Sequence, residues 1–251
     1  MSSIASLTVT FLFISSCLSV EIPSFVPRCC QEDPKLGECF IKGTEDLRQY
    51  TKTGHKALGI PPISPLFIQE IKFEQLTESL DVNVLLKNAT VTGLDTYEFT
   101  EFTYDPKNYT FHGHVKVGAL TVVSKIDFSG EVFDVKLSGT GEVSGTSDPT
   151  EATFNVYGKI VKKDGEDFFE VTDGNTQVKK LGGKIHFANF QSDNNELVAA
   201  LNDVINSNAQ VLIRQLRGPI ETLAKTTILE IVNGLAGTVP YNVVFPHCKK
   251  E

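Results

Sequence analysis

The chain has 251 residues, and its 31 acidic and 23 basic side chains give a formal net charge of −8. This acidic balance argues against nucleic acid as a partner, because phosphate backbones are bound through clusters of Lys and Arg. It also argues against docking on anionic lipid head groups. The length suffices for one large domain or two small ones.

Residues 1–20 have the pattern of a secretory signal peptide. They carry no charged side chain and contain a mostly apolar run, Leu7–Ile14, so we expect cleavage near Ser19 or Val20. A membrane anchor is the weaker alternative, because the run is shorter than the ~20 residues that span a bilayer. We therefore expect a secreted, extracellular protein without stable membrane insertion, in which residues 21–251 form a single domain.

Four cysteines lie beyond the signal peptide, at positions Cys29, Cys30, Cys39 and Cys248. An even number in a secreted chain predicts two disulfides. Because a bond between Cys29 and Cys30 would be strained, one of them should pair with Cys39 and the other with Cys248. A metal site is disfavoured, because the chain has no Cys-x-x-Cys motif beside a His.

The first predicted helix begins at Asp33 and ends near Gly54. Asp33 is a helix-capping residue type, and Pro34 suits the first helical position, where its missing N–H is not needed. The next segment, Leu58–Leu66, has three prolines within five residues. Because proline fixes φ and cannot donate a hydrogen bond, we expect an extended strap there that leads into the first strand.

From Ile71 to Phe190 apolar and polar residues alternate, which predicts six or seven long antiparallel strands. Turn signals occur at 163–165 and 173–175. In the segment around residue 112, His112 and His114 lie on the polar side of one strand.

Asn88 interrupts this alternation. Val84 and Leu86 share a strand face that Asn88 would also occupy, and a bulge near Asn88 would return Ala89 and Val91 to the core. Asn88-Ala-Thr90 is also a sequon, as is Asn108-Tyr-Thr110, so we expect Asn88 and Asn108 to be exposed N-glycosylation sites.

The C-terminal part, Asp193–Gly237, is predicted to form one long amphipathic helix. Its apolar residues recur every three or four positions, and at ~1.5 Å per residue it would be on the order of 60 Å long. Pro219 removes a hydrogen bond to residue 215 and should kink the helix. Beyond Pro219 the helix is apolar on nearly all sides, so we expect that half to be the more completely enclosed.

These elements predict an α+β fold: a highly curved antiparallel sheet wrapped around one long C-terminal helix, with a short N-terminal helix. An open sheet can bury its apolar face against a single helix only by curling around it. A long sheet around a helix ~10 Å wide tends to leave apolar space, so an internal tunnel follows naturally from this architecture.

The sequence carries no motif of catalysis. It lacks a Gly-x-Ser-x-Gly elbow, a phosphate-binding loop and a dinucleotide fingerprint. His112 and His114 could bind a metal, but Lys116 two residues further indicates that this face meets solvent. We therefore expect neither an enzyme nor a cofactor or metal site.

Several segments resemble one family. These are Pro23–Phe25, Cys29 followed by Asp33-Pro34 and Cys39, the strap Leu58–Leu66, Leu181–Asn189, Val239–Tyr241 and Phe245-Pro246. Together they make the chain similar to the insect takeout and haemolymph juvenile hormone-binding proteins, over nearly its full length.

That resemblance implies a super-roll of the TULIP type, with an internal hydrophobic tunnel that holds a terpenoid hormone, a fatty acid or a similar ligand. It also implies a Cys29–Cys39 disulfide. A second bond between Cys30 and Cys248 is our own inference, because these two cysteines depart from the common family pattern.

The leading hypothesis is a secreted, non-catalytic and monomeric carrier of a small lipophilic ligand. The alternative is an extracellular signalling or interaction protein with a closed core, which acts through its outer surface on an unidentified receptor. Isolated polar residues on the buried side of the helix, Asn208 and Thr227, could bond a ligand head group, although a backbone carbonyl is the better partner. The predicted ligand-binding residues are Leu66, Phe67, Phe73, Phe111, Val115, Phe133, Val135, Phe154, Leu201, Ile205, Asn208, Leu212 and Leu216.

Overall fold

The structure is a computed structural model that describes residues 22–74, 82–132, 135–192, 207 and 209–248. Its helices are α1 (Leu36–Leu47), α3 (Ala209–Gln215), α4 (Arg217–Thr238) and α5 (Tyr241–Val244), with 3-10 turns at Arg48–Tyr50, Lys56–Leu58 and Leu94–Thr96. The strands are β1 (Leu66–Glu74), β2 (Val82–Thr92), β3 (Glu98–Asp105), β4 (Thr110–Val117), β5 (Thr121–Val132), β6 (Val135–Ser147), β7 (Thr150–Lys163), β8 (Glu166–Val178) and β9 (Gly183–Ser192).

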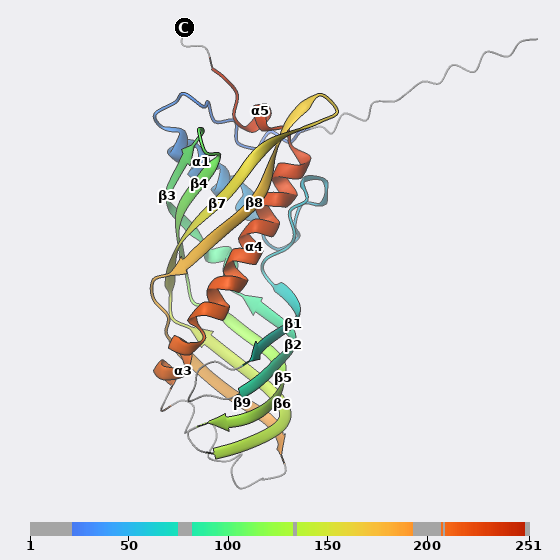
Figure 1. Ribbon diagram of the computed structural model, residues 1–251, viewed down its shortest axis with the longest axis vertical. Coiled ribbons are helices and arrows are strands. Elements are labelled where there is room, and N and C mark those ends of the chain that lie inside the picture. Colours follow the sequence, from blue (N-terminus) through green and yellow to red (C-terminus); the bar gives the residue numbers. More distant parts are fainter. Residues whose placement is uncertain (1–21, 75–81, 133–134, 193–206, 208, 249–251) are drawn as a thin grey trace, which may run out of the picture.

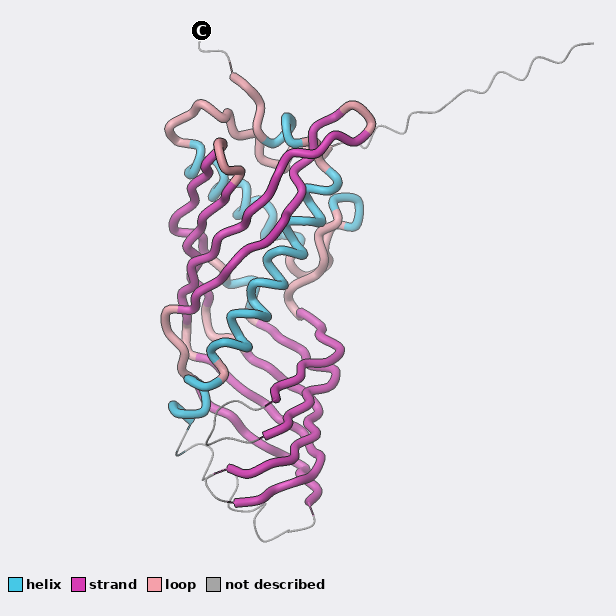
Figure 2. Tube along the Cα trace, in the orientation of Figure 1, coloured by secondary structure: helices cyan, strands magenta, loops and turns pink. Residues whose placement is uncertain are grey.

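The strands form two antiparallel sheets, which follow one another along the long axis of the molecule (Figure 1). One has five strands in the order β1-β2-β5-β6-β9, and the other has four in the order β3-β4-β7-β8. Helix α4 runs beside the four-stranded sheet (Figure 2). Helices α1 and α5 lie toward the end of the molecule that is away from the five-stranded sheet. The α+β fold is confirmed, but nine described strands in two sheets replace the six or seven that we expected in one.

The segment 173–175, predicted to be a turn, lies inside strand β8. Asp173 pairs with Tyr157 and Asn175 pairs with Asn155, inside the β7–β8 ladder. The β7–β8 register shifts next to this segment, between Tyr157 and Gly158. The residue types that predicted a turn are also tolerated in a β-bulge.

The first helix begins later than predicted. The Asp33 carboxylate accepts the backbone N–H of Lys35 at 2.8 Å and the Asp33 carbonyl accepts that of Leu36 at 3.0 Å, so Asp33 closes a turn that precedes the helix. Helical structure then continues through a 3-10 turn to Tyr50 and stops before Gly54.

The predicted bulge at Asn88 is confirmed. The β2–β5 register shifts between Lys87 and Thr90, and Asn88 has φ 53°. On either side of the shift the apolar residues keep to one face, so Ala89 and Val91 are buried while Asn88 is exposed.

The C-terminal helix is divided in two and is less enclosed than expected. Residue Leu216 separates α3 from α4, and Pro219 then occupies the first turn of α4, where no intrahelical N–H is required. No residue of α4 is fully buried, so the half beyond Pro219 is not enclosed on all sides, and its comparison with the first half stays a prediction. Helix α4 lies against the sheet on one side only, while Thr222, Thr226 and Glu230 remain exposed. The predicted start of the long helix lies outside the described residues.

Both expected disulfides are present, Cys29–Cys39 and Cys30–Cys248. Backbone hydrogen bonds accompany them, from Cys29 N–H to the Val244 carbonyl at 2.8 Å and from Gln31 N–H to the Pro246 carbonyl at 3.1 Å. The C-terminal segment is therefore fastened along the segment that precedes α1.

The four-stranded half has a closed, aromatic core. Phe111 is 7% exposed, and the centroids of five other aromatic rings lie between 4.4 and 5.9 Å from its ring centroid. Phe154 packs across Gly113, where a Cβ atom would come within 2.3 Å of the Phe154 ring. The space between this sheet, α1 and α5 is thus filled by side chains.

A close backbone contact joins α4 to the strap. A Cβ atom placed on Gly234 would lie 1.9 Å from the carbonyl oxygen of Gly59, whereas one on Gly237 in the same helix would meet nothing within 4 Å. We expect Gly234→Ala to lower the free energy of unfolding by about 1–3 kcal/mol, as overpacking does. Gly237→Ala should leave it unchanged or raise it by up to about 1 kcal/mol, because alanine is the better helix former. Urea denaturation of both variants measures this, and equal effects would contradict the contact.

Stability should also fall at high pH. Burial raises the pKa of Tyr97 to about 12, above the ~10 of an unfolded tyrosine. A phenol whose pKa is raised by folding favours the folded state below the unfolded pKa, and this contribution is lost as pH rises. We expect the free energy of unfolding to decrease between pH 10 and 12, with a shallower decrease in Tyr97→Phe. An unchanged slope in that variant would contradict this assignment.

Candidate binding face

The five-stranded sheet has one apolar face, which its register defines. Residues opposite one another on adjacent strands point to the same side, and the rows run Phe73–Val84–Phe128–Gly139, Ile71–Leu86–Ile126–Gly141 and Leu66–Val91–Val122–Gly145–Ile185. Ser124, Val143 and Phe187 form a further row, with Ile68 and Ala89 beside it. We call these rows the apolar face.

The apolar face is only partly covered by the described residues. Ile126 and Ser124 are 3% exposed and Ala89 is fully buried, but Phe73 and Phe128, toward one end of the sheet, are intermediate. Helix α3 lies near β9 (Figure 1), and its Ile213 is buried. This face therefore differs from the packed core of the four-stranded half.

Strand β6 presents glycine to the apolar face at three positions, Gly139, Gly141 and Gly145. A Cβ atom on Gly145 would meet only the Lys184 carbonyl oxygen, at 3.7 Å. At these positions β6 has no side chain, whereas the paired residues of β5 are Phe128, Ile126 and Val122. The layer of side chains on the apolar face is therefore thinner over β6 than over β5.

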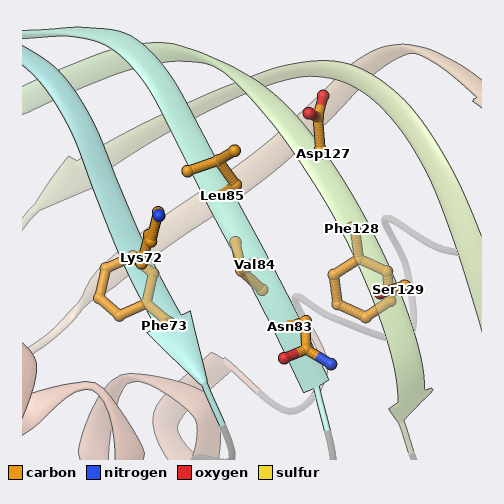
Figure 3. Close-up of a pocket in the computed structure, with 8 residues that line it drawn as sticks. All are labelled: Lys72, Phe73, Asn83, Val84, Leu85, Asp127, Phe128 and Ser129. Carbon is orange, nitrogen blue, oxygen red and sulfur yellow. The ribbon is translucent and has the colours of Figure 1, made fainter.

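A hollow of about 370 Å³ lies over the ends of β1, β2 and β5 (Figure 3). Its volume is in the range of small-molecule sites, ~300–1,000 Å³. The hollow is open, and residues of both sheet faces line it: Lys72, Phe73, Asn83, Val84, Leu85, Asp127, Phe128 and Ser129. It is therefore an open depression at the end of the sheet and not an enclosed tunnel.

The polar groups nearest the apolar face are satisfied within the protein. The Ser124 hydroxyl lies 3.0 Å from the Lys87 carbonyl oxygen and 2.8 Å from that of Lys125. Thr227 lies on α4, which packs on the other sheet, and its hydroxyl donates to the Leu223 carbonyl at 3.0 Å, which confirms a backbone carbonyl as its partner. The face can thus attract a ligand through burial of apolar surface more than through polar contacts.

The opposite face of this sheet is charged. Lys72, Leu85 and Asp127 form one row there, and Lys87 makes an ion pair with Asp127. Phe67 belongs to this outer side, because it pairs with Thr90, which pairs with Val123. Phe67 is 69% exposed, so it does not lie on the apolar face, where the register places Leu66 and Ile68 instead.

The other predicted binding residues fall into three groups. Leu66 and Phe73 lie on the apolar face. Phe111, Val115 and Phe154 belong to the packed core of the four-stranded half, where neighbouring side chains leave them 5–8% exposed, so we no longer assign them to the site. The remaining ones are not placed at the face. Leu216 is the partly buried residue between α3 and α4, and the side chains of Val135 in β6 and Leu212 in α3 are not described. The others lie outside the described residues: Phe133, Leu201, Ile205 and Asn208.

Sequence reasoning missed Ile126, Phe128, Val143 and the three glycines of β6. The period-2 pattern of residues 122–128 and the glycines spaced by two at 139 and 141 were visible signals. They become informative only when the register shows that they share one face.

His112 and His114 bind polar side chains of their own sheet. His112 Nδ1 lies 2.9 Å from Asn155 Oδ1, and His114 Nδ1 lies 2.8 Å from the Thr100 hydroxyl. Within the described ranges, no three His, Cys, Asp or Glu side chains gather as metal ligands would.

A partly covered apolar sheet face is a candidate site for a hydrophobic ligand. The family comparison is more specific: residues 7–246 match the model of the family described as haemolymph juvenile hormone binding protein (JHBP). The chain belongs to this family, whose members are non-catalytic binding proteins for hydrophobic ligands. Membership of a haemolymph family, together with two disulfides, indicates an extracellular protein.

Two relatives agree with this assignment. The circadian clock-controlled protein daywake of Drosophila yakuba is 21% identical over 233 residues, which cover 89% of this chain and 88% of that protein. The crystal structure of Takeout 1 from Epiphyas postvittana superposes with a TM-score of 0.72 at 16% identity, over 88% of this chain and all of that one. This second likeness shows a shared fold. In the part of the chain that the structure describes, no helix is long and apolar enough to cross a membrane.

Proposed function

We propose that the protein is a secreted, monomeric carrier that holds a small lipophilic ligand, such as a terpenoid or a fatty acid, against the apolar face of its five-stranded sheet. The observation that supports this most is the combination of a partly covered apolar face with glycine at Gly139, Gly141 and Gly145. Residues 1–20 would direct secretion, and residues 21–251 would form the single binding domain, glycosylated at Asn88 and Asn108.

The expected affinity comes from apolar burial. At ~25 cal/mol per Å², a ligand of 15–20 carbons that buries several hundred Å² gains enough for about micromolar or tighter binding after the costs of association. Glycine at three positions along β6 would favour an extended ligand that follows this strand. Few polar groups would fix its head group, so we expect selection by length and shape.

The first test is whether the secreted protein contains a bound lipophilic molecule. Protein purified from the medium of insect cells under mild conditions should yield a lipophilic molecule on solvent extraction, in close to equimolar amount by mass spectrometry. A fluorescent fatty-acid probe should then bind the delipidated protein at one to one. Absence of both an extractable lipid and stoichiometric probe binding would instead favour a signalling protein with a closed interior.

The second test is a substitution that fills the floor of the apolar face. Gly145→Leu should weaken probe binding at least tenfold, because its side chain enters the space along β6, while the thermal midpoint changes little. Thr146→Leu is the matched control, since Thr146 is the next residue of β6 and faces the other side. Equal probe affinities of the two variants would exclude the apolar face as the site.

A further inference from the structure

The outer face of the five-stranded sheet carries an exposed apolar pair. Phe67 is 69% and Val123 52% exposed, and among the described residues they are the large hydrophobic side chains most open to solvent. Thr90 lies between them, because Phe67 pairs with Thr90 and Thr90 with Val123. We call Phe67, Thr90 and Val123 the outer patch. It begins at β1, which is an edge strand.

The outer patch contains part of a glycosylation sequon. Thr90 is the third residue of Asn88-Ala-Thr90, and the buried Ala89 anchors the segment from the other side. The bulge turns Asn88 outward, with φ 53° and an exposed side chain. Along β2, Asn88 lies two residues before Thr90, whose partners on the neighbouring strands are Phe67 and Val123.

The two sequons differ in how the acceptor side chain is held. Nδ2 of Asn108 donates to the Asp105 carboxylate at 2.7 Å, in the turn between β3 and β4. No hydrogen bond to a described residue holds the Asn88 side chain. Asn88 therefore presents its amide freely beside an apolar surface, whereas Asn108 stands on a polar turn.

We propose that Asn88 carries an N-glycan whose first sugars lie over Phe67 and Val123 and cover the outer patch.

In the reaction that attaches this glycan, the Asn88 amide nitrogen attacks the anomeric carbon of a lipid-diphosphate-linked oligosaccharide. The new C–N bond replaces the C–O bond to the diphosphate, which leaves with the electron pair, and one amide proton passes to solvent. This inference rests on the proposed secretory route but not on ligand binding, because the patch lies on the opposite side of the sheet from the apolar face.

A glycan fits this surface better than a second copy of the chain. An exposed apolar edge strand invites pairing with another chain, and proteins protect such edges with covers, charges or bulges. The Asn88 bulge sits in β2 beside that edge, so a bulky hydrophilic chain attached there would obstruct pairing along β1. The apolar C–H faces of the sugars can pack on the Phe67 ring, which supplies the contact area.

Occupancy is tested on the full chain secreted from insect cells. Enzymatic release of glycans in heavy-oxygen water should mark Asn88 as converted to Asp by peptide mass spectrometry. Thr90→Ala should remove this mark and Thr90→Ser should retain it, since serine also completes the sequon. An unoccupied Asn88 in the secreted protein would overturn the proposal.

Coverage is tested by hydroxyl-radical footprinting of the folded protein before and after release of the glycans. Oxidation of Phe67 should rise several-fold on release, while that of Phe168 in β8 should stay constant. In Asn108→Gln, which leaves Asn88 as the glycosylated sequon under test, the rise at Phe67 should persist.

An equal oxidation rate of Phe67 with and without the glycan would refute coverage. If glycan-free protein has the mass of a dimer and its Phe67 is protected, the outer patch is instead covered by a second copy of the chain. Loss of lipid binding alone would alter neither readout.

Discussion

In the part of the chain that the structure describes, the long helix α4 packs on only one of the two sheets, and the difference between the two halves follows from this. The described helix α4 lies along the four-stranded sheet, where Ile228, Leu229 and Val232 reach the core. It is fixed there by polar contacts as well, because the Glu221 carboxylate accepts the Val178 N–H at 2.8 Å and Lys225 pairs with Asp173 at 2.9 Å. The five-stranded sheet receives only α3 from the described helices, near β9. Among the described residues, its apolar face is therefore less completely covered than the core of the four-stranded half.

The two halves therefore play different physical roles. Aromatic rings fill the four-stranded half, and small residues such as Gly113 and Gly174 let rings and helix side chains approach the sheet closely. In the five-stranded half, a Cβ atom on Gly145 would meet only one atom within 4 Å. Glycine therefore allows close packing at Gly113 and Gly174 and leaves unfilled space at Gly145.

The sequence predicted the features that depend on local pattern. The alternation around Asn88 located a bulge to the residue, and the strap of Leu58–Leu66 was correctly read as non-helical. The division into two sheets was not predictable in this way, because pairing between distant strands leaves no mark in either strand alone. For the same reason Phe111 and Phe67 were both assigned to the binding site: each is aromatic and lies on an alternating strand, and only the register and the burial place one in a packed core and the other on the outer surface. Helix α4 is less enclosed than its apolar composition suggests, because composition says which residues avoid water but not how many sides of a helix are covered.

The bond between Cys30 and Cys248 spans 218 residues and so joins the two ends of nearly the whole described chain. Closing a loop of that size removes conformational freedom from the unfolded chain worth about 5 kcal/mol in the chain-entropy model. The covalent closure lies at the aromatic end of the molecule, far along its axis from the face proposed to bind. Because this constraint acts on the unfolded chain, it stabilises both halves of the fold, and it does so whether or not the apolar face is occupied.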